Sequence, residues 1–402
     1  MIIVGQIIIY LIMLCAVIGA IAYVINQDSE LGNEFAEGIN TIGPLFIPIA
    51  GAMAAVPYLS IFIKAVFGPA FIALGADPSI AATTIFSCDM GGYQLAYTLA
   101  QSNESWIMAM LIGFMAGPTL TFTIPVALSM LNKSDHKYFV LGIIPGILSV
   151  PIGVFISSIF IYFTHPSIRT IMSSSSPLDY QLNLSLMTIL SNLTPLIIIC
   201  VLIAVGFWLL PDKMISGFIK FGKIITAFLT FVLLISILEY FTGIFSSVLG
   251  SWGFEPIIAD SDNQMRALEV CGNIGMMLAG AYPMVFLINK YLSKGLVTVG
   301  NKLGLGSYGS TGVLAASANT LAMFRLVKDM RTSDKVKCIA YSVCGCFVIG
   351  DFLVYTANFQ PTLIVQVMLG KFLGGLCGIL IASKLTVPKA LSLEQEEKGI
   401  TM

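Results

Sequence analysis

Residues 2–25, IIVGQIIIYLIMLCAVIGAIAYVI, contain no charged side chain and are apolar at nearly every position. A transmembrane α-helix needs about 20 consecutive apolar residues to cross the hydrocarbon core of a bilayer, so this stretch predicts a membrane-spanning helix. No positively charged run and no small-residue cleavage site accompany it before Asn26. We therefore expect a retained first helix and not a cleaved signal peptide.

Similar apolar windows recur along all 402 residues, of which 57% are hydrophobic and 10% are charged. The mean hydropathy is +0.93. A soluble domain carries about 25% charged residues, so this chain cannot cover a surface that faces water. We predict an all-α polytopic membrane protein with about 10–11 transmembrane or re-entrant helices. The candidates are 2–25, 39–66, 80–100, 105–131, 137–163, 184–210, 219–249, 263–290, 308–328, 336–357 and 361–386.

The longest polar connection, 164–183, predicts a boundary between two halves. It contains Ser173-Ser174-Ser175-Ser176-Pro177. We expect an N-terminal membrane half at 1–163 and a C-terminal membrane half at 184–386, with interrupted helices near the midplane of one integral membrane domain. Residues 387–402 are expected to form a short, polar, disordered cytoplasmic tail.

Positive charge predicts the orientation in the membrane. Lysines follow the fourth, sixth and eighth segments, whereas segments 27–38 and 251–262 are acidic. This alternation places the N-terminus in the cytoplasm. Lys328, Arg331 and Lys335 break the alternation, because they follow the ninth segment on the side expected to be outside. We prefer a re-entrant or broken segment at 308–325, which returns to the inside, over an exception to the charge rule.

Two short segments repeat one pattern. Ser87-Cys88-Asp89 in the third segment resembles Ser317-Ala318-Asn319 in the ninth. A glycine-led break follows each of them, Gly117-Pro118-Thr119 in the first case and Gly350-Asp351 in the second. Interrupted segments at corresponding positions of two halves indicate a transporter binding site near the midplane.

Asp89 lies within Ser87-Cys88-Asp89-Met90-Gly91-Gly92-Tyr93, inside an apolar stretch. A carboxylate at membrane depth costs roughly 2.5–3.5 kcal/mol on insertion scales, and such residues are functional by default. Gly91 and Gly92 are poor helix formers and allow the backbone to open around it. The pattern favours a binding site for a small cation. The alternative is a protonated Asp89 bonded to a backbone carbonyl.

Five ionisable residues have apolar sequence around them: Asp89, Arg266, Glu269, Asp351 and Lys371. Arg266 and Glu269 are three apart on one helix, so they form either a neutral pair or part of a binding site. Lys371 needs an acid from another helix, and Asp351 or Asp89 can supply it. If Lys371 pairs with Asp351, then Asp89 is the acid that is left to bind a cation. The opposite assignment, in which Lys371 pairs with Asp89, is also open.

Aromatic and polar side chains could complete such a site. Tyr93, four residues after Asp89, is expected on the same helical face, where its ring could contact a cation. Further candidates for the site, each of which could instead pack or link helices, are Tyr282, Phe324, Phe352, Thr119, Asn273, Asn319 and Asn358.

Other classes of protein fit the sequence less well. The eight cysteines and two histidines show no metal-ligand spacing, so no metal or cofactor is expected. A net charge of −1 gives no reason to expect nucleic acid. An intramembrane aspartyl protease would use two acids such as Asp89 and Asp351. Its Gly-x-Gly-Asp motif requires glycine where this chain has Val348, so we expect no enzyme activity. A structural or receptor role would need a ligand-facing domain that the short polar segments do not provide.

Several motifs, taken together and in order, resemble the ethanolamine permeases of bacterial ethanolamine-utilisation operons. They are Ser87–Gly92, Gly117-Pro118-Thr119, Ile124–Leu128, Arg266–Val270, Gly280–Val285, Ala318-Asn319, Gly350-Asp351 and Gly370-Lys371. The resemblance spans nearly the whole chain. It implies a carrier of the bacterial cytoplasmic membrane that takes up ethanolamine by alternating access.

The chemistry of ethanolamine agrees with this resemblance. Its amine resembles that of lysine, with a pKa of about 10, so it is a cation with one hydroxyl at neutral pH. The implied substrate-binding residues are Asp89, Tyr93, Glu269, Asn319 and Asp351. The implied supporting residues are Gly91, Gly92, Thr119, Arg266, Asn273 and Lys371. Another small cationic or zwitterionic solute is the alternative substrate. Membrane lipid is the expected surrounding partner, and energy coupling and a homodimer both stay open.

Overall fold

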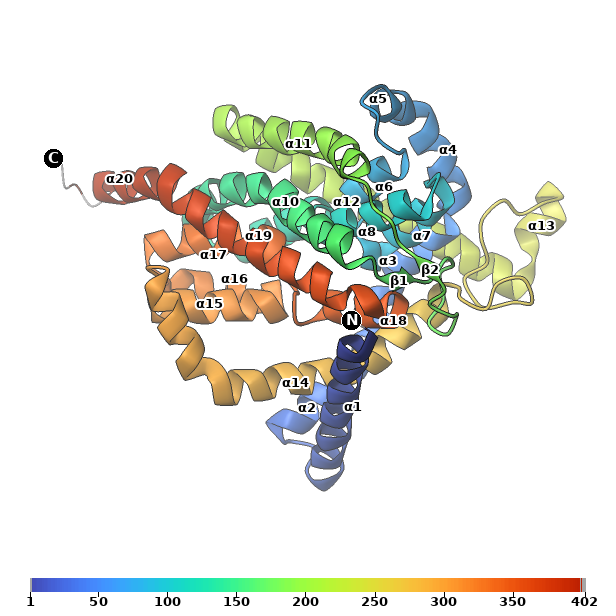
Figure 1. Cartoon of the computed structure of the whole chain (residues 1–402), viewed down its shortest axis with the longest axis horizontal. Helices are drawn as coiled ribbons and strands as arrows, with labels where there is room; N and C mark the ends of the chain where they lie inside the picture. Colours follow the sequence, from blue (N-terminus) through green and yellow to red (C-terminus); the bar gives the residue numbers. More distant parts are fainter. Residues whose placement is uncertain (1, 398, 400–402) are drawn as a thin grey trace.

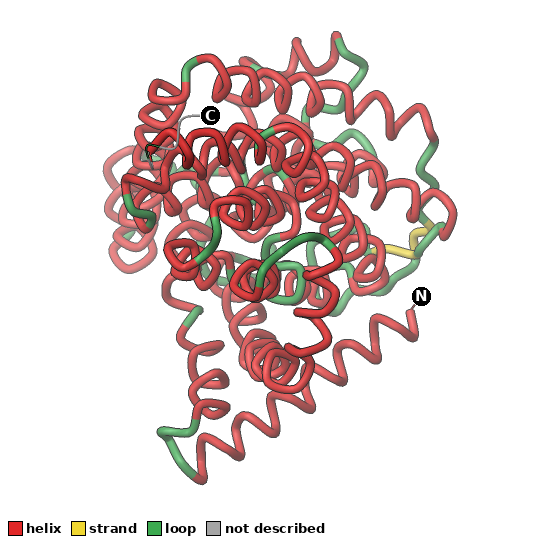
Figure 2. Tube along the Cα trace, turned by 90° about the vertical axis from the view of Figure 1, so that its left-hand side faces the viewer, coloured by secondary structure: helices red, strands yellow, loops and turns green. Residues whose placement is uncertain are grey.

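The computed structural model describes residues 2–397 and 399, with side chains outside positions 2, 121–122, 292–299 and 301. Nearly all of this part of the chain is α-helical (Figures 1 and 2). The two short strands that occur in it, β1 (Ser167–Ile168) and β2 (Tyr180–Gln181), pair antiparallel within the long polar connection. The structure therefore confirms the predicted all-α class.

Six helices are long and apolar enough to cross a membrane. A seventh span is possible if residues Glu30–Ala54 and Val56–Val66, which are bent relative to each other, cross it together. The pair bends by 63° between Ala54 and Val56. It comprises α2 (Glu30–Asn40), α3 (Ile42–Ala54) and α4 (Val56–Val66). The six long helices are α1 (Ile2–Ile25), α10 (His136–Thr164), α11 (Leu186–Leu209), α12 (Pro211–Thr242), α14 (Ala267–Lys302) and α19 (Ile364–Leu385).

The centre of the molecule is formed by α10, α17 (Thr332–Gly345) and α19, which pack against one another. Glycines at the contacts allow this close approach. A Cβ at Gly146 would lie 2.7 Å from Cβ of Val343, and one at Gly374 would lie 2.9 Å from Cα of Gly153. The three helices form a buried scaffold that supports the shorter, broken segments.

The third predicted segment, 80–100, is not a single helix. It is a hairpin of α6 (Ser79–Ile85), the 3₁₀ turn η1 (Cys88–Met90) and α7 (Gly92–Leu99). Gly91 has φ +83°, which interrupts the right-handed helix. At the base, one oxygen of Asp77 accepts from the backbone N–H of Ser79 at 2.9 Å and the other from that of Gln101 at 3.0 Å. The two ends of the segment therefore lie together, and the segment is re-entrant.

The ninth predicted segment forms a second helical hairpin, a shape that the predicted re-entrant segment requires. It comprises α15 (Ser307–Ala318) and α16 (Thr320–Leu326), with extended backbone at Asn319 between them. Its ends are joined because Nζ of Lys337 donates to the carbonyl of Gly304 at 3.0 Å. In addition, Oδ2 of Asp334 accepts from the backbone N–H of Gly306 at 3.1 Å.

The bases of the two hairpins lie at opposite ends of α10. Lys335, beyond the second hairpin, pairs with Asp135 at the start of α10 at 2.6 Å. At the first hairpin, the backbone N–H of Asp77 donates to Oδ1 of Asn192 in α11 at 2.8 Å, and α11 follows the far end of α10. A helix of 29 residues is about 43 Å long. The hairpins therefore enter the bundle from opposite sides (Figure 1).

Two further segments are broken near the hairpin tips. The first runs through α8 (Asn103–Met115), the π-helical η2 (Thr119–Thr123) and α9 (Ile124–Met130). The second joins α17 to α18 (Asp351–Phe359). The remaining short elements are α5 (Gly68–Ala73), α13 (Ile244–Leu249), η3 (Lys133–Asp135), η4 (Val327–Asp329) and η5 (Pro361–Leu363).

Residues Val387–Glu397 of the predicted tail are helical, so the expectation of disorder was wrong for them; positions 398 and 400–402 lie outside the described residues. Residues Val387–Glu397 form α20, which packs against α17 and α19. Val387 and Ala390 are buried in this contact, so apolar burial by two residues orders an otherwise polar segment.

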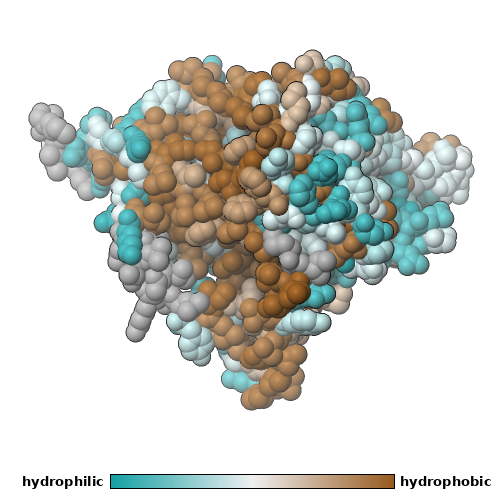
Figure 3. Space-filling view, viewed as in Figure 1, coloured by the Kyte–Doolittle hydropathy of each residue, from teal (hydrophilic) through white to brown (hydrophobic). Residues whose placement is uncertain are grey.

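The surface is that of a multi-pass membrane protein. Figure 3 shows apolar residues across the middle of one face and hydrophilic residues gathered towards its two ends. Large apolar side chains are exposed along α1, α11 and α12, including Ile7, Leu202 and Phe231 at 58%, 64% and 60%. A soluble protein does not expose apolar surface on this scale, whereas lipid covers it without penalty.

Candidate functional site

A cavity of about 320 Å³ lies where the hairpin tips and the helix breaks meet. Residues from four places line it: the tip of the α6–α7 hairpin, the tip of the α15–α16 hairpin, the break between α8 and α9, and the break between α17 and α18. The end of α2 and the start of α3 complete its lining. Its lining comprises Glu37, Asn40, Thr41, Pro44, Leu45, Pro48, Ser87, Asp89, Met90, Pro118, Tyr282, Asn319, Leu321, Phe347, Asp351 and Phe352.

Asp89 is positioned by the turn at the tip of the first hairpin. Ser87 is extended, Cys88–Met90 form one 3₁₀ turn, and Gly91 reverses the chain. The Ser87 hydroxyl donates to Oδ1 of Asp89, which fixes the direction of the half-buried carboxylate. A Cβ at Gly92 would collide with the carbonyl oxygens of Phe86 and Ser87. Both glycines are therefore needed for the turn that presents Asp89 to the cavity.

Asp351 enters the same cavity from the first turn of α18, where the helix dipole favours a negative charge. Its Oδ1 is buried and has no hydrogen-bond partner in the described part of the chain. Asp351 also lies within range of the charge of Asp89. Two carboxylates thus converge on one space, an arrangement that a cation between them would stabilise.

Neither carboxylate forms a direct ion pair. Among the described residues, no lysine or arginine lies within ion-pair distance of Asp89 or Asp351. The expected direct contact between Lys371 and one of these acids is therefore absent, although the charge of Lys371 still acts on Asp89. Lys371 is fully buried, and its Nζ donates to the carbonyl of Phe114 at 2.5 Å. It lies 4.3 Å from the ring centre of Phe352, on the other side of the cavity wall.

The expected pair of Arg266 with Glu269 is also absent. The guanidinium of Arg266 pairs with Glu255 and, at 2.9 Å, with Asp260. The pKa of Asp260 is lowered, chiefly because its carboxylate accepts from the backbone N–H of Asn263. The guanidinium of Arg266 lowers it further. Oε2 of Glu269 accepts from the backbone N–H of Arg266 at 3.2 Å, as in a helix N-cap. Both residues organise the start of α14, and neither lines the cavity.

Tyr93 does not share a face with Asp89, because Gly91 interrupts the helix between them. Its fully buried ring stacks on Trp106 with centroids 4.7 Å apart. Its hydroxyl accepts from Nε2 of Gln360 at 3.0 Å. The spacing rule for residues four apart applies within one continuous helix, and the left-handed turn breaks that continuity.

Thr119 and Asn273 link helices instead of lining the cavity. The Thr119 hydroxyl donates to the carbonyl of Val343 at 3.2 Å. The carbonyl of Asn273 accepts from Nδ2 of Asn358 at 3.3 Å, and Nδ2 of Asn273 lies 3.6 Å from the sulfur of Met265. Asparagine and threonine side chains in membrane helices often link helices through such hydrogen bonds.

Asn319, at the second tip, does line the cavity. Its Oδ1 accepts from the backbone N–H of Leu321 at 2.9 Å and so caps α16. The amide donor Nδ2 is then available to a ligand. Of the aromatic candidates, Tyr282 and Phe352 line the cavity, whereas Phe324 does not and is buried against Phe139.

Sequence reasoning missed the contribution of α2. Glu37, Asn40 and Thr41 line the cavity, and Glu37 is an exposed third carboxylate. Glu37 was placed in the acidic external segment 27–38, and Asn40 and Thr41 at the start of the predicted helix 39–66, so none of them was expected at the site. The amphipathic spacing of α2 was the signal that could have placed one face of it against the bundle.

The pattern that Ser87-Cys88-Asp89 and Ser317-Ala318-Asn319 share in the sequence also has a counterpart in the structure. Each hairpin tip packs on its own glycine-led break, because a Cβ at Gly117 would lie 2.6 Å from Cα of Ser87, and one at Gly350 would collide with the carbonyl of Ala318. The backbone N–H of Ile349 also donates to the carbonyl of Ser317 at 2.9 Å. The two tip-and-break pairs form the two main walls of the cavity. No group of three or more metal-binding side chains occurs in the described residues.

Comparison with known proteins agrees with this architecture. The family model described as "Ethanolamine utilisation protein, EutH" matches residues 4–385. The "Probable ethanolamine permease EutH" of Listeria monocytogenes is 34% identical, with 94% of this chain and 93% of that protein aligned. The protein of the same name in Escherichia coli is 33% identical across 96% of each chain. "Uncharacterized protein YxeR" of Bacillus subtilis is 32% identical across 94% of each. No solved structure matches. The chain belongs to the EutH family.

Proposed function

We propose that this chain is a permease of the bacterial cytoplasmic membrane that takes up protonated ethanolamine. Two lines of support are independent of each other. Relatives aligned over nearly the whole chain bear the name ethanolamine permease. The cavity between the hairpins presents two carboxylates that form no direct ion pair among the described residues, which suits a small cation.

The observation that carries the proposal is the pair Asp89 and Asp351. Uncompensated carboxylates at membrane depth are costly unless a ligand pairs with them. The ammonium group of ethanolamine offers three N–H donors and one positive charge, as the lysine ammonium does. In this proposal it binds between Asp89 and Asp351, and the ring of Phe352 adds a cation–π contact of about 0.5–2 kcal/mol.

The hydroxyl of ethanolamine needs a separate partner. Nδ2 of Asn319 can donate to the hydroxyl oxygen while Oδ1 continues to cap α16. Tyr282 lies in the same cavity wall and offers a second polar group. A site that bonds a hydroxyl discriminates against an analogue without one, because its polar group is then left unpaired.

Transport follows from the position of the cavity between two re-entrant hairpins. The first hairpin separates the cavity from one side of the membrane and the second separates it from the other. We propose that the tips move in alternation, so that the cavity opens to one side at a time. Glu37, exposed at the rim, would attract the cation towards the cavity.

Uptake of labelled ethanolamine into proteoliposomes at pH 7 tests the proposal. We expect Asp89→Asn and Asp351→Asn each to reduce uptake at least about tenfold, because asparagine keeps the shape but removes the charge. Asp179→Asn, in the exposed polar connection, is the matched control and should transport normally. Normal uptake by both cavity variants would contradict the assigned binding residues. A folded wild-type protein that does not transport ethanolamine would contradict the substrate.

Another small cationic or zwitterionic solute remains the second candidate, because the cavity exceeds the needs of a ligand with four non-hydrogen atoms. Competition separates the two. Unlabelled ethanolamine should inhibit uptake at concentrations at which ethylamine, choline and amino acids do not. Stronger inhibition by a larger solute would favour the alternative.

A further inference from the structure

A second and larger cavity, of about 780 Å³, shares no lining residue with the acidic one. It opens between the start of α10, the end of α11, the start of α12 and the helix α20. Five lysines and one histidine line it, with Asp212 as the single acid in the lining. The basic residues are Lys133, His136, Lys137, Lys220, Lys223 and Lys389.

The positive charge of this cavity is largely uncompensated. Within the described residues, Lys137 pairs with Glu397, whereas Lys133, Lys220, Lys223 and Lys389 form no ion pair. Lysines that surround one cavity repel one another and keep it strongly electropositive. An anionic group that enters the cavity would relieve this repulsion.

Apolar side chains line the same cavity as the lysines. They are Leu141 and Ile144 of α10, Phe207 of α11, and Ile215 and Ile219 of α12. At the rim, Trp208 is 44% exposed and Nζ of Lys389 lies 4.4 Å from its ring centre. Tryptophan and lysine at such a position mark the interface between headgroups and acyl chains.

The packing of α12 leaves room for an occupant. No residue of Pro211–Phe221 is buried, although the later turns of the helix bury Leu229, Val232 and Leu233. The first third of α12 thus lies across the cavity from α10, and the lining between them combines lysines with apolar side chains. A ligand that matches both kinds of lining carries a phosphate and acyl chains.

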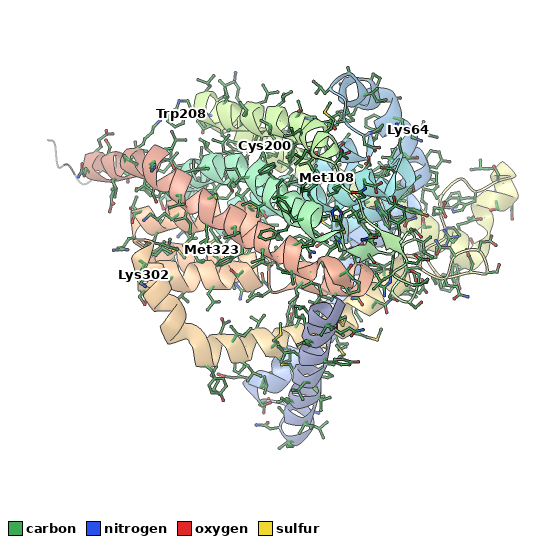
Figure 4. All side chains as sticks on the ribbon, in the orientation of Figure 1. Lys64, Met108, Cys200, Trp208, Lys302 and Met323 are labelled. Atoms are coloured by element: carbon green, nitrogen blue, oxygen red, sulfur yellow. The ribbon has the colours of Figure 1, made fainter. Side chains whose placement is uncertain are left out.

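We propose that this cavity binds the headgroup of an anionic phospholipid and anchors the start of α12 to α10 and α20. The lysine-rich side is the one that charge asymmetry places in the cytoplasm, where basic pockets between membrane helices bind such headgroups. Figure 4 shows Trp208 at the same end of the molecule as Lys302, with Lys64 at the opposite end.

Binding to the purified full-length protein tests the proposal without any measurement of transport. Phosphatidylglycerol added in detergent should raise the apparent Tm by at least about 2 °C, because a ligand that binds the folded state stabilises it. Phosphatidylcholine with the same acyl chains, which has no net charge, should not. Glycerol phosphate and inorganic phosphate, added in the same assay, test whether a phosphate group without acyl chains is sufficient to raise the apparent Tm.

The variant Lys133→Gln/Lys220→Gln/Lys223→Gln should weaken phosphatidylglycerol binding about a hundredfold in native mass spectrometry, since each lysine contributes roughly fivefold. Its substituted side chains are exposed, so its Tm without lipid should match that of the wild type. The matched control, Lys302→Gln/Lys328→Gln/Lys384→Gln, removes equal charge from exposed sites outside the cavity.

Equal loss of binding in both triple variants would overturn the proposal, because the lipid would then respond to net charge alone. Equal stabilisation by glycerol phosphate would overturn it in favour of a soluble phosphate compound. No difference between phosphatidylglycerol and phosphatidylcholine would overturn it as well.

Discussion

Gly91 is the residue on which the direction of Asp89 depends. Its φ of +83° strains any side chain, and a Cβ there would lie 2.6 Å from Cβ of Ala52. We expect Gly91→Ala to destabilise the protein by about 1–2 kcal/mol or more and to abolish uptake. Gly217→Ala is the matched control, because Gly217 lies in α12 with no atom within 4 Å of the added Cβ.

This control should be stabilised by about 0.5–1 kcal/mol, as an exposed helical glycine usually is by alanine. Thermal unfolding and uptake, measured on both variants in parallel, check the prediction. An unchanged Tm and unchanged uptake in Gly91→Ala would show that the left-handed turn is dispensable.

Lys371 is a buried cation behind the cavity, and its charge opposes that of the substrate. Replacing a buried ion with an apolar side chain of similar volume is often neutral or stabilising, by up to about 4 kcal/mol. We therefore expect Lys371→Met to fold with an equal or higher Tm. Its KM for ethanolamine should fall on the order of tenfold, because a like charge near the binding site is removed.

Lys371→Arg, which keeps the charge, is the control and should keep the wild-type KM if it folds. The measurements are Tm and the concentration dependence of uptake. Loss of uptake in Lys371→Met, with uptake retained in Lys371→Arg, would instead assign the lysine charge a required role in the transport cycle.

At the scale of elements, each hairpin is closed at its base by one aspartate. Asp77 closes the α6–α7 hairpin and Asp334 closes the α15–α16 hairpin. Removing Asp77 leaves the buried backbone N–H of Ser79 unpaired, at a cost of about 1–3 kcal/mol, whereas removing Asp334 frees the part-buried N–H of Gly306 at a lower cost. In hydrogen exchange, Asp77→Ala should lose protection over 79–99 and Asp334→Ala over 307–326. Uniform loss over the whole chain in either variant would contradict the independence of the hairpins.

The elements that the sequence predicted well are the long, uninterrupted ones. The predicted 2–25, 137–163 and 184–210 match α1, α10 and α11 within two residues, because an apolar run bounded by polar residues suffices to define them. The α6–α7 hairpin was missed because two short apolar helices joined by a turn have the length and hydropathy of one crossing.

The site was predictable only in part, for reasons that differ between residues. Asp89, Asn319 and Asp351 stood out as polar groups at glycine-rich breaks, and all three line the cavity. The partners of Lys371 and Arg266 depended on which helices pack together, which spacing along one helix does not reveal. Glu37 belongs to the cavity because the end of α2 packs against the bundle, a tertiary feature.

At the scale of the whole molecule, the packed bundle should protect its thiols. All eight cysteines are free, and seven are buried, with Cys377 partly exposed. We expect N-ethylmaleimide to modify at most one cysteine per folded molecule and all eight after denaturation. Mass spectrometry of the intact protein counts the adducts. Rapid modification of three or more thiols in the folded protein would be inconsistent with this packing, and uptake should be insensitive to the reagent.

The separate closures of the two hairpins have a consequence for how such a carrier can evolve. Asp77 and Asp334 share no contact partner, so a change that loosens one entrance leaves the other as it was. In the proposed transport cycle, selection can then adjust the rate of loading and the rate of discharge independently. A lineage that meets scarce substrate and one that must limit back-flow could diverge through different single substitutions while keeping the same proposed binding residues.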